Sequence, residues 1–119
     1  MKKIIVTVFT LSLMAFAAYA VAKGSGASAK KGAQLFMTKG CTACHTIGKG
    51  KLVGPDLKGV TKKRTVAWLK NWLKNTTKMQ ATDPTAKKLL QEYNVPMPQQ
   101  SLSDQDINDL IDYFKSNDK

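Results

Sequence analysis

The hydrophobic positions of this chain recur three and four residues apart, which is the spacing of amphipathic α-helices. Four segments show this pattern, over about 30–39, 65–75, 84–93 and 104–116. In the last segment one face carries the apolar residues Ile107, Leu110, Ile111 and Phe114. No segment alternates apolar and polar residues with the two-residue period of a β-strand. The sequence therefore predicts an all-α domain of about four helices.

Local signals indicate where three of these helices begin. Thr65 is expected to be an N-cap, and Asp83 is expected to cap a helix that opens with Pro84. Ser103 and Asp106 have the spacing of a capping box. These signals predict three sharply defined helix starts.

Two segments are expected to be irregular. Residues 46–62 hold four glycines and one proline, and we expect a loop there. Val95-Pro96-Met97-Pro98 cannot be helical, because proline lacks the backbone N–H and restricts the residue before it. Both loops are candidates to carry functional side chains.

The N-terminal residues are expected to lie outside the domain. Lys2 and Lys3 precede an uncharged run that ends in the A-x-A pattern of signal-peptidase sites. We expect three parts: a signal peptide over 1–22, a flexible Gly/Ser/Ala spacer over 23–29, and a folded domain over 30–119. A retained membrane anchor is the alternative, because the run holds 19 residues and could cross a bilayer. Either reading places the domain outside the cytoplasmic membrane.

The chain is basic, with 19 Lys and Arg against 8 Asp and Glu. Without Lys2 and Lys3 the remainder keeps a net charge of +9. A basic exported domain favours an acidic protein partner or a membrane surface. Nucleic acid is not expected as a partner, because the lysines are spread along the chain behind an export signal. A domain this short also buries a thin core and usually needs a cofactor, metal or disulfide.

The most specific motif is Cys41-Thr42-Ala43-Cys44-His45, a C-x-x-C-H sequence. Two thiols at this spacing can form thioethers with the two vinyl groups of a haem, and the adjacent imidazole can then ligate the iron. The motif predicts one covalently bound haem c, attached through Cys41 and Cys44 and ligated by His45.

Three other uses of these cysteines compete with haem attachment. A disulfide between Cys41 and Cys44 is conceivable in an oxidising compartment. A thioredoxin-like redox site would need a βαβ unit, which the pattern lacks. A zinc site would need four nitrogen or sulfur ligands, and the chain has two cysteines and one histidine. The haem interpretation accounts best for the motif together with export.

The second axial ligand is expected to be a methionine, because His45 is the only histidine. Met37 is expected to pack in the core, which leaves Met79 and Met97. Prolines on both sides of Met97 stiffen its segment and favour it, whereas Met79 is expected to be partly exposed near a helix end. A plain core methionine remains the alternative role for Met97.

A haem with both axial positions filled by protein has no open site for substrate, so the ligand set predicts a one-electron carrier and not an enzyme. Two alternatives stay open. One is a five-coordinate haem sensor or peroxidase-like protein, which would need Met97 to be displaced. The other is a membrane-tethered haem subunit of a reductase or oxidase complex, held by an uncleaved N-terminal segment.

These residues together resemble the class I cytochromes c, the mitochondrial and bacterial type, over about 30–115. The G-P-D-L loop, the W-L helix and the late M-P are similar to those of short bacterial members. The resemblance implies a class I fold of about four helices around one haem. It further implies that Gly32 and Phe36 pack against Leu110 and Tyr113. An electron carrier between respiratory-chain proteins in the periplasm is then expected, with anchoring to the outer side of the cytoplasmic membrane as the alternative.

The resemblance also implies roles around the haem. The carbonyl of Pro55 is expected to accept a hydrogen bond from His45, which would fix the imidazole. Arg64 and Trp68 match residues that bind or shield a haem propionate. A solvated Arg64 and a Trp68 that only packs on the haem form the alternative.

A basic surface near the exposed haem edge is expected to meet acidic redox partners, both the electron donor and the acceptor. It is predicted from Lys49, Lys51, Lys58, Lys62, Lys63 and Arg64. The acids gather late in the chain, at Asp104, Asp106, Asp109, Asp112 and Asp118. This asymmetry predicts a charge dipole that steers encounter, with the protein acting as a monomer.

Overall fold

The structure, a computed structural model, describes residues 25–119. The expected signal peptide over 1–22 lies outside the described residues. Within them the chain forms helices and no strand: α1 Ser25–Thr38, the 3₁₀ turn η1 Cys41–Ala43, α2 Val60–Lys63, α3 Val66–Lys74, α4 Thr76–Thr82, α5 Pro84–Tyr93 and α6 Asp104–Asn117. The all-α prediction is confirmed, with α2 and α4 as helices beyond the four expected. No helix in this part of the chain has the length and apolar character needed to cross a membrane.

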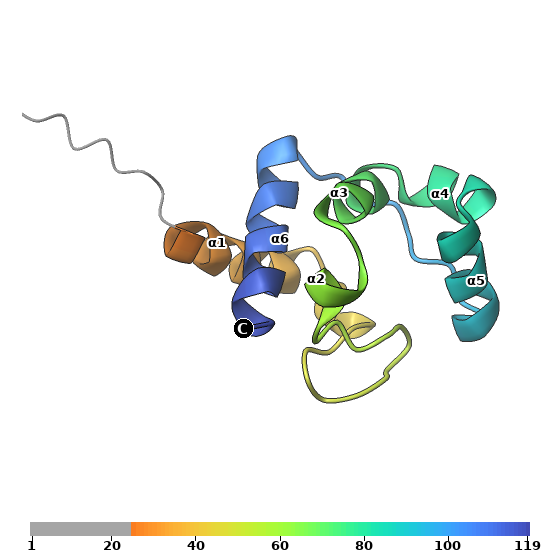
Figure 1. The fold of residues 1–119 in the computed structure, drawn as a ribbon, viewed down its shortest axis with the longest axis horizontal. Helices are drawn as coiled ribbons and strands as arrows, with labels where there is room; N and C mark the ends of the chain where they lie inside the picture. The colour runs from red at the N-terminus through yellow and green to blue at the C-terminus, as the bar shows by residue number, and fades with distance from the viewer. Residues whose placement is uncertain (1–24) are drawn as a thin grey trace, which may run out of the picture.

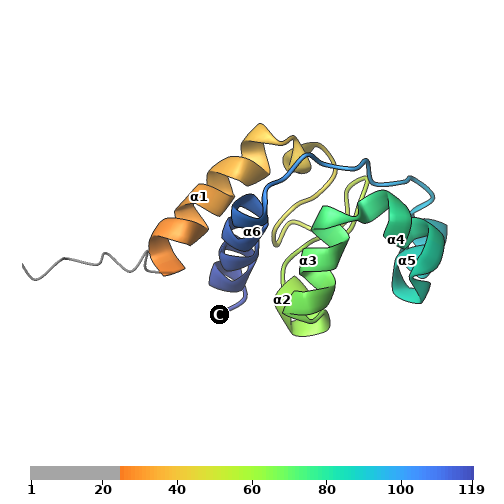
Figure 2. The same ribbon diagram turned by 90° about the horizontal axis from the view of Figure 1, so that it is seen from above.

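The helices are arranged around α6 (Figures 1 and 2). α1 crosses one side of α6, and α3 packs on the other side. α4 and α5 pack together at the far end, beyond α3. The long irregular segments, before α2 and between α5 and α6, connect these parts.

The crossing of α1 and α6 depends on a glycine. A Cβ placed on Gly32 would lie 2.0 Å from the backbone oxygen of Asp109, so only glycine permits this approach. The rings of Phe36 and Tyr113 then meet at 5.6 Å between centroids, and Leu110 is fully buried beside them. The expected packing of the first helix on the last is confirmed.

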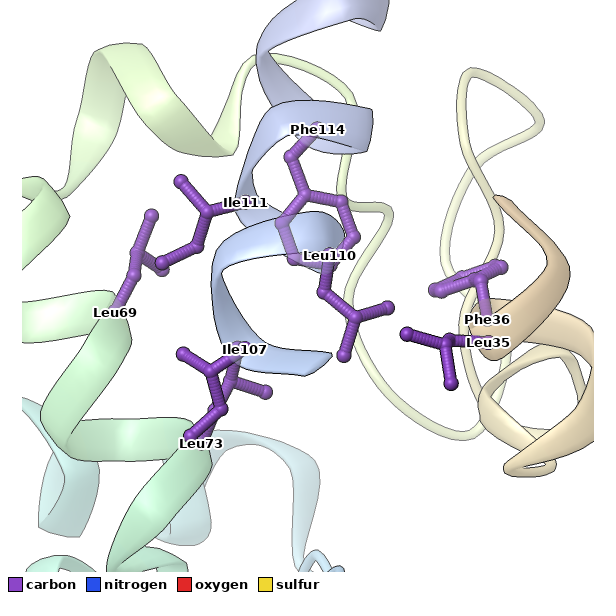
Figure 3. Packing of buried hydrophobic residues seen from close by; sticks show 8 residues of the cluster. All are labelled: Leu35, Phe36, Leu69, Leu73, Ile107, Leu110, Ile111 and Phe114. Atoms are coloured by element: carbon purple, nitrogen blue, oxygen red, sulfur yellow. The ribbon is translucent and has the colours of Figure 1, made fainter. Parts of the chain in front are cut away.

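The core is one cluster contributed by three helices (Figure 3). α6 supplies its centre, α1 contacts one side and α3 the other. The buried members are Leu35, Phe36, Leu69, Leu73, Ile107, Leu110, Ile111 and Phe114. Each such side chain stabilises the fold by about 1.5–3 kcal/mol when fully removed from water. The last helix, whose apolar face the sequence analysis identified, is therefore the one at the centre.

All three expected helix caps are present. The Thr65 hydroxyl accepts from the third backbone N–H of α3 at 3.1 Å, and the Asp83 carboxylate caps α5 in front of Pro84. Ser103 and Asp106 form a complete capping box on α6. These signals are local, so the sequence suffices to place them.

The prediction of a flexible spacer over 23–29 is wrong for residues 25–29, the part of it that the structure describes. α1 begins at Ser25, not near Lys30, and Ser28 is buried. The Ser28 hydroxyl donates to the Asp109 carboxylate at 2.6 Å, which ties the first turns of α1 to α6. The contact joins residues 81 positions apart, so the local Gly/Ser/Ala composition does not reveal it.

The expected loop over 46–62 ends earlier, because α2 begins at Val60. The carboxylate of Asp118 accepts from the backbone N–H of Gly59 at 2.6 Å and of Thr61 at 2.9 Å. Burial alone would raise the pKa of Asp118, but hydrogen bonds from Thr61 and Gly59 outweigh it and lower the pKa. A residue near the end of the sequence thus caps this short helix.

Two methionines occupy environments opposite to those expected. Met37 is 70 % exposed on α1, whereas Met79 is 4 % exposed. Met79 is buried because it lies on α4, which packs against α5. The sequence pattern missed α4, whose three threonines are weak helix formers. The expected core role of Met37 and exposed position of Met79 are both wrong.

Candidate haem site

A cleft lies between the segment that follows α1 and the segment before α6. Its larger part has a volume of about 280 Å³ and a smaller adjoining part about 80 Å³. Six residues line both parts: His45, Pro55, Trp72, Leu89, Tyr93 and Met97. Cys41 lines the larger part and Cys44 the smaller one. The fold thus gathers the four residues predicted as attachment points and ligands around one hollow.

A tight turn presents the two cysteines to this cleft. Gly40 lies between α1 and η1 in the left-handed conformation, with φ of 73°, which glycine adopts without strain. η1 follows, and the backbone N–H of His45 donates to the Cys41 carbonyl at 2.9 Å. Both cysteines are free thiols and partly buried. Burial raises the pKa of the Cys41 thiol.

The imidazole of His45 is fixed by the loop that follows it. Its Nδ1 lies 2.9 Å from the Pro55 carbonyl oxygen, as the family resemblance implied. Because a carbonyl can only accept, Nδ1 carries the proton and donates. Nε2 then keeps its lone pair and is free to ligate a metal.

Gly54 makes room for this ring, a role that the sequence reasoning missed. Its backbone N–H donates to the Cys44 carbonyl at 2.7 Å. A Cβ on Gly54 would lie 2.7 Å from Cε1 of His45 and 3.0 Å from Nδ1. The glycine before Pro55 was the available signal, because a close backbone approach often requires glycine.

Asp56 organises the same loop and was also missed. Its carboxylate accepts three backbone N–H bonds, from Gly48, Gly50 and Lys58, each at 2.8 Å. The hydrogen bonds from Gly48, Lys58 and Gly50 lower the pKa of Asp56. One side chain therefore closes the loop that carries Gly54 and Pro55.

Met97 lies on the irregular segment between α5 and α6, and its side chain is half-buried at the cleft. Its backbone N–H donates to Oε1 of Gln80 at 3.0 Å, and its carbonyl accepts from Nε2 of Gln80 at 2.9 Å. Met79 lines neither part of the cleft. Of the two methionines considered, Met97 is the one near His45.

Arg64 and Trp68 both line the larger part of the cleft. The indole Nε1 of Trp68 donates to the Asp83 carboxylate at 3.3 Å, so the protein already supplies one acceptor. The Arg64 guanidinium lies 5.6 Å from the Trp68 ring, which stacks on Trp72 at 5.5 Å. The contact of either residue with a haem propionate stays a prediction.

The chemistry of the cleft fits a haem. Its lining is mainly apolar, and it offers two thiols, one imidazole nitrogen and one thioether sulfur. Nitrogen and thioether ligands suit a haem iron, and the thiols suit covalent attachment. In residues 25–119 no group of three or more His, Cys, Asp or Glu side chains could hold a bare metal ion. A helical fold around such a cleft defines a c-type haem protein.

Comparisons with known proteins agree with this class. A family model described as "Cytochrome c" matches residues 29–118. The chain belongs to the cytochrome c family, and the covalent haem c predicted from its motif is confirmed. Proteins of this family transfer electrons through their haem.

Individual relatives add detail. A solved cytochrome c from Rhodothermus marinus is 35 % identical, with a TM-score of 0.73 over 76 % of this chain and 77 % of that one. An engineered form of it, described as bound to a carbene intermediate, is 35 % identical with a TM-score of 0.68 over the same shares. Cytochrome c-551 from Azotobacter vinelandii is 59 % identical over 32 residues, which are 27 % of this chain and 38 % of that protein.

Proposed function

We propose that this protein is a one-electron carrier whose haem is attached through Cys41 and Cys44 and ligated by His45 and Met97. The observation that carries the proposal is the shared position of His45 and Met97, which line both parts of one cleft. A carrier without enzymatic turnover follows, because this ligand set leaves no axial position for a substrate.

The residues of the chain have separate tasks in this proposal. Bound haem supplies the one-electron couple between Fe(III) and Fe(II). The Pro55 carbonyl holds the proton on Nδ1 of His45, so Nε2 remains a ligand. Apolar residues such as Leu69 and Leu89 line the cleft and would keep water from the haem. Less water near the haem means that protein and solvent reorganise less when an electron is transferred. Arg64 lines the larger part of the cleft, where its guanidinium would meet a negative group of the haem.

Substituting each methionine tests the ligand assignment. Met97→Ala should abolish the weak methionine-to-iron absorption band of the oxidised protein and lower its reduction potential. Met79→Ala removes a buried side chain on α4, so it should reduce stability but keep the band. Loss of the band in Met79→Ala alone would overturn the choice of Met97.

Intact mass checks the two attachment sites, by comparing covalently bound haem in the wild type with that in Cys41→Ala and Cys44→Ala.

The proposed location is the periplasm, following export by residues 1–22. This rests on the charge pattern and small residues of that segment. N-terminal sequencing of protein purified from cells separates the alternatives. A start at Lys23 supports the periplasmic carrier, whereas an intact N-terminus supports a protein held at the outer side of the cytoplasmic membrane.

The proposed partners are acidic redox proteins of a respiratory chain. Exposed cations lie on the loop after the haem motif and on α2, namely Lys49, Lys51, Lys58, Lys62 and Lys63. Nζ of Lys51 lies 4.5 Å above the Tyr93 ring, which lines both parts of the cleft. The opposing acidic face is weaker than the sequence indicated, because Asp109 and Asp118 are buried and hydrogen-bonded. Asp104 is in addition paired with Lys74 at 2.7 Å.

Salt dependence tests this docking surface. Electron transfer to an acidic acceptor should slow as ionic strength rises, since the Debye length falls from about 30 Å at 0.01 M to about 8 Å at 0.15 M. Lys51→Glu or Lys62→Glu should slow it further at low salt. A rate that stays constant over this range would overturn the basic docking surface and leave the carrier function intact.

A further inference from the structure

The segment that carries Met97 has little order of its own. In the described chain, residues 95–102 make no backbone–backbone hydrogen bond. Pro96 and Pro98 have no backbone N–H to offer. The position of Met97 therefore depends on bonds from other parts of the molecule.

One side chain satisfies both backbone polar groups of Met97. Oε1 of Gln80 accepts from the Met97 N–H at 3.0 Å, while Nε2 of Gln80 donates to the Met97 carbonyl at 2.9 Å. A single carboxamide thus pairs with this residue on both sides, as an adjacent β-strand would. Both bonds are partly buried, where hydrogen bonds are stronger than in water.

Gln80 is itself held in place by the helix that carries it. On α4, Thr76 and Met79 are buried, and the Thr76 hydroxyl donates to the Trp72 carbonyl at 2.6 Å. This anchors α4 to the end of α3, whose Trp72 lines the cleft. A helix fixed in this way therefore presents the Gln80 carboxamide to the irregular segment that carries Met97.

We propose that Gln80 is a positioning residue that clamps Met97 in its ligating place and keeps external ligands from that coordination position. The proposal rests on the ligation by Met97 proposed above. An external ligand can bind there only when Met97 has moved away, so its apparent affinity is reduced by the small population of that open state. Breaking the clamp raises this population.

Gln80→Leu tests the clamp, because leucine has similar bulk and no polar group. Imidazole is the probe, titrated into the oxidised holoprotein. Two lost hydrogen bonds predict about tenfold tighter imidazole binding. Hydrogen exchange at the Met97 amide should accelerate by a similar factor. The matched control is Gln91→Leu, the same change at an exposed position of α5, which should alter neither quantity.

The outcomes separate the clamp from the ligand assignment. If Met97→Ala leaves the methionine-to-iron band in place, the proposed ligand is wrong. If Met97→Ala abolishes the band but Gln80→Leu keeps wild-type imidazole affinity and Met97 exchange, the clamp is wrong and the carrier function stands.

Should Gln80→Leu fail to fold, Gln80→Glu keeps the acceptor for the Met97 N–H and removes the donor to its carbonyl. It should bind imidazole a few-fold more tightly, and unchanged affinity would overturn the clamp.

Discussion

The two sides of the cleft place their candidate ligands by different means. His45 is held by its own neighbourhood, through Gly54, Pro55 and Asp56, all within eleven positions of it. Met97 is held by Gln80, which lies 17 positions earlier on α4. One irregular segment is closed by bonds within itself, whereas the other is ordered by a helix that packs beside it.

This difference indicates that the methionine side opens before the histidine side. A segment without backbone pairing of its own has few interactions to break, so its local opening free energy is low. The histidine loop, in contrast, combines backbone bonds with the three bonds to Asp56. We therefore expect changes on one side to leave the other side largely unaffected, and three substitutions examine this.

The largest effect is expected from Gly54→Ala on the histidine side. The added methyl group would overlap the His45 ring, which must shift or break its bond to Pro55. Overpacking of this kind costs about 2 kcal/mol of unfolding free energy. Denaturant unfolding of the holoprotein measures it. Gly26→Ala is the control, because a Cβ there meets nothing within 4 Å.

An intermediate effect is expected from Asp56→Asn, and only as a dependence on pH. Because the pKa of Asp56 is lowered in the fold, its contribution to stability is complete above the ordinary carboxyl pKa, about 4, and is lost as pH falls through the lowered value. Asp56→Asn should flatten this acid-side loss of unfolding free energy. Asp112→Asn, which removes a carboxylate without backbone N–H bonds in the described residues, should leave Asp56's contribution in place. An unchanged slope in Asp56→Asn would show that the loop does not depend on this charge.

The smallest effect is expected from Gln99→Leu on the methionine side. Gln99 donates to the Lys74 carbonyl at 3.0 Å and accepts from the Thr77 N–H at 3.2 Å, but both bonds are exposed. Exposed bonds of this kind contribute little, so imidazole affinity should rise only about twofold. The loss of unfolding free energy at acid pH, which depends on Asp56, should not change. A change in that loss would mean that the two sides are coupled.

The histidine side could be predicted well from sequence because its signals are local. The C-x-x-C-H motif gives the candidate attachment residues directly, and the resemblance to cytochromes c supplied Pro55. Thr65, Asp83 and Ser103 cap helices for the same reason, since each bonds within three positions of itself.

The methionine side could be predicted only in part. Prolines singled out Met97, but Gln80 escaped notice because α4 has a weak helical pattern and its contact is visible only in three dimensions. The same limit explains the early start of α1, which depends on Ser28 meeting Asp109. Gly54 and Asp56 lay within the predicted loop, yet their roles require its folded path.

The stacked pair of Trp68 and Trp72 gives the protein an optical property. These are the only two tryptophans in the sequence, and both line the larger part of the cleft. A haem in that cleft would accept their excitation energy, so the folded protein should emit little tryptophan fluorescence. Emission should appear as α3 separates from the cleft. The chain thus contains an intrinsic reporter of its own unfolding, which needs no added dye.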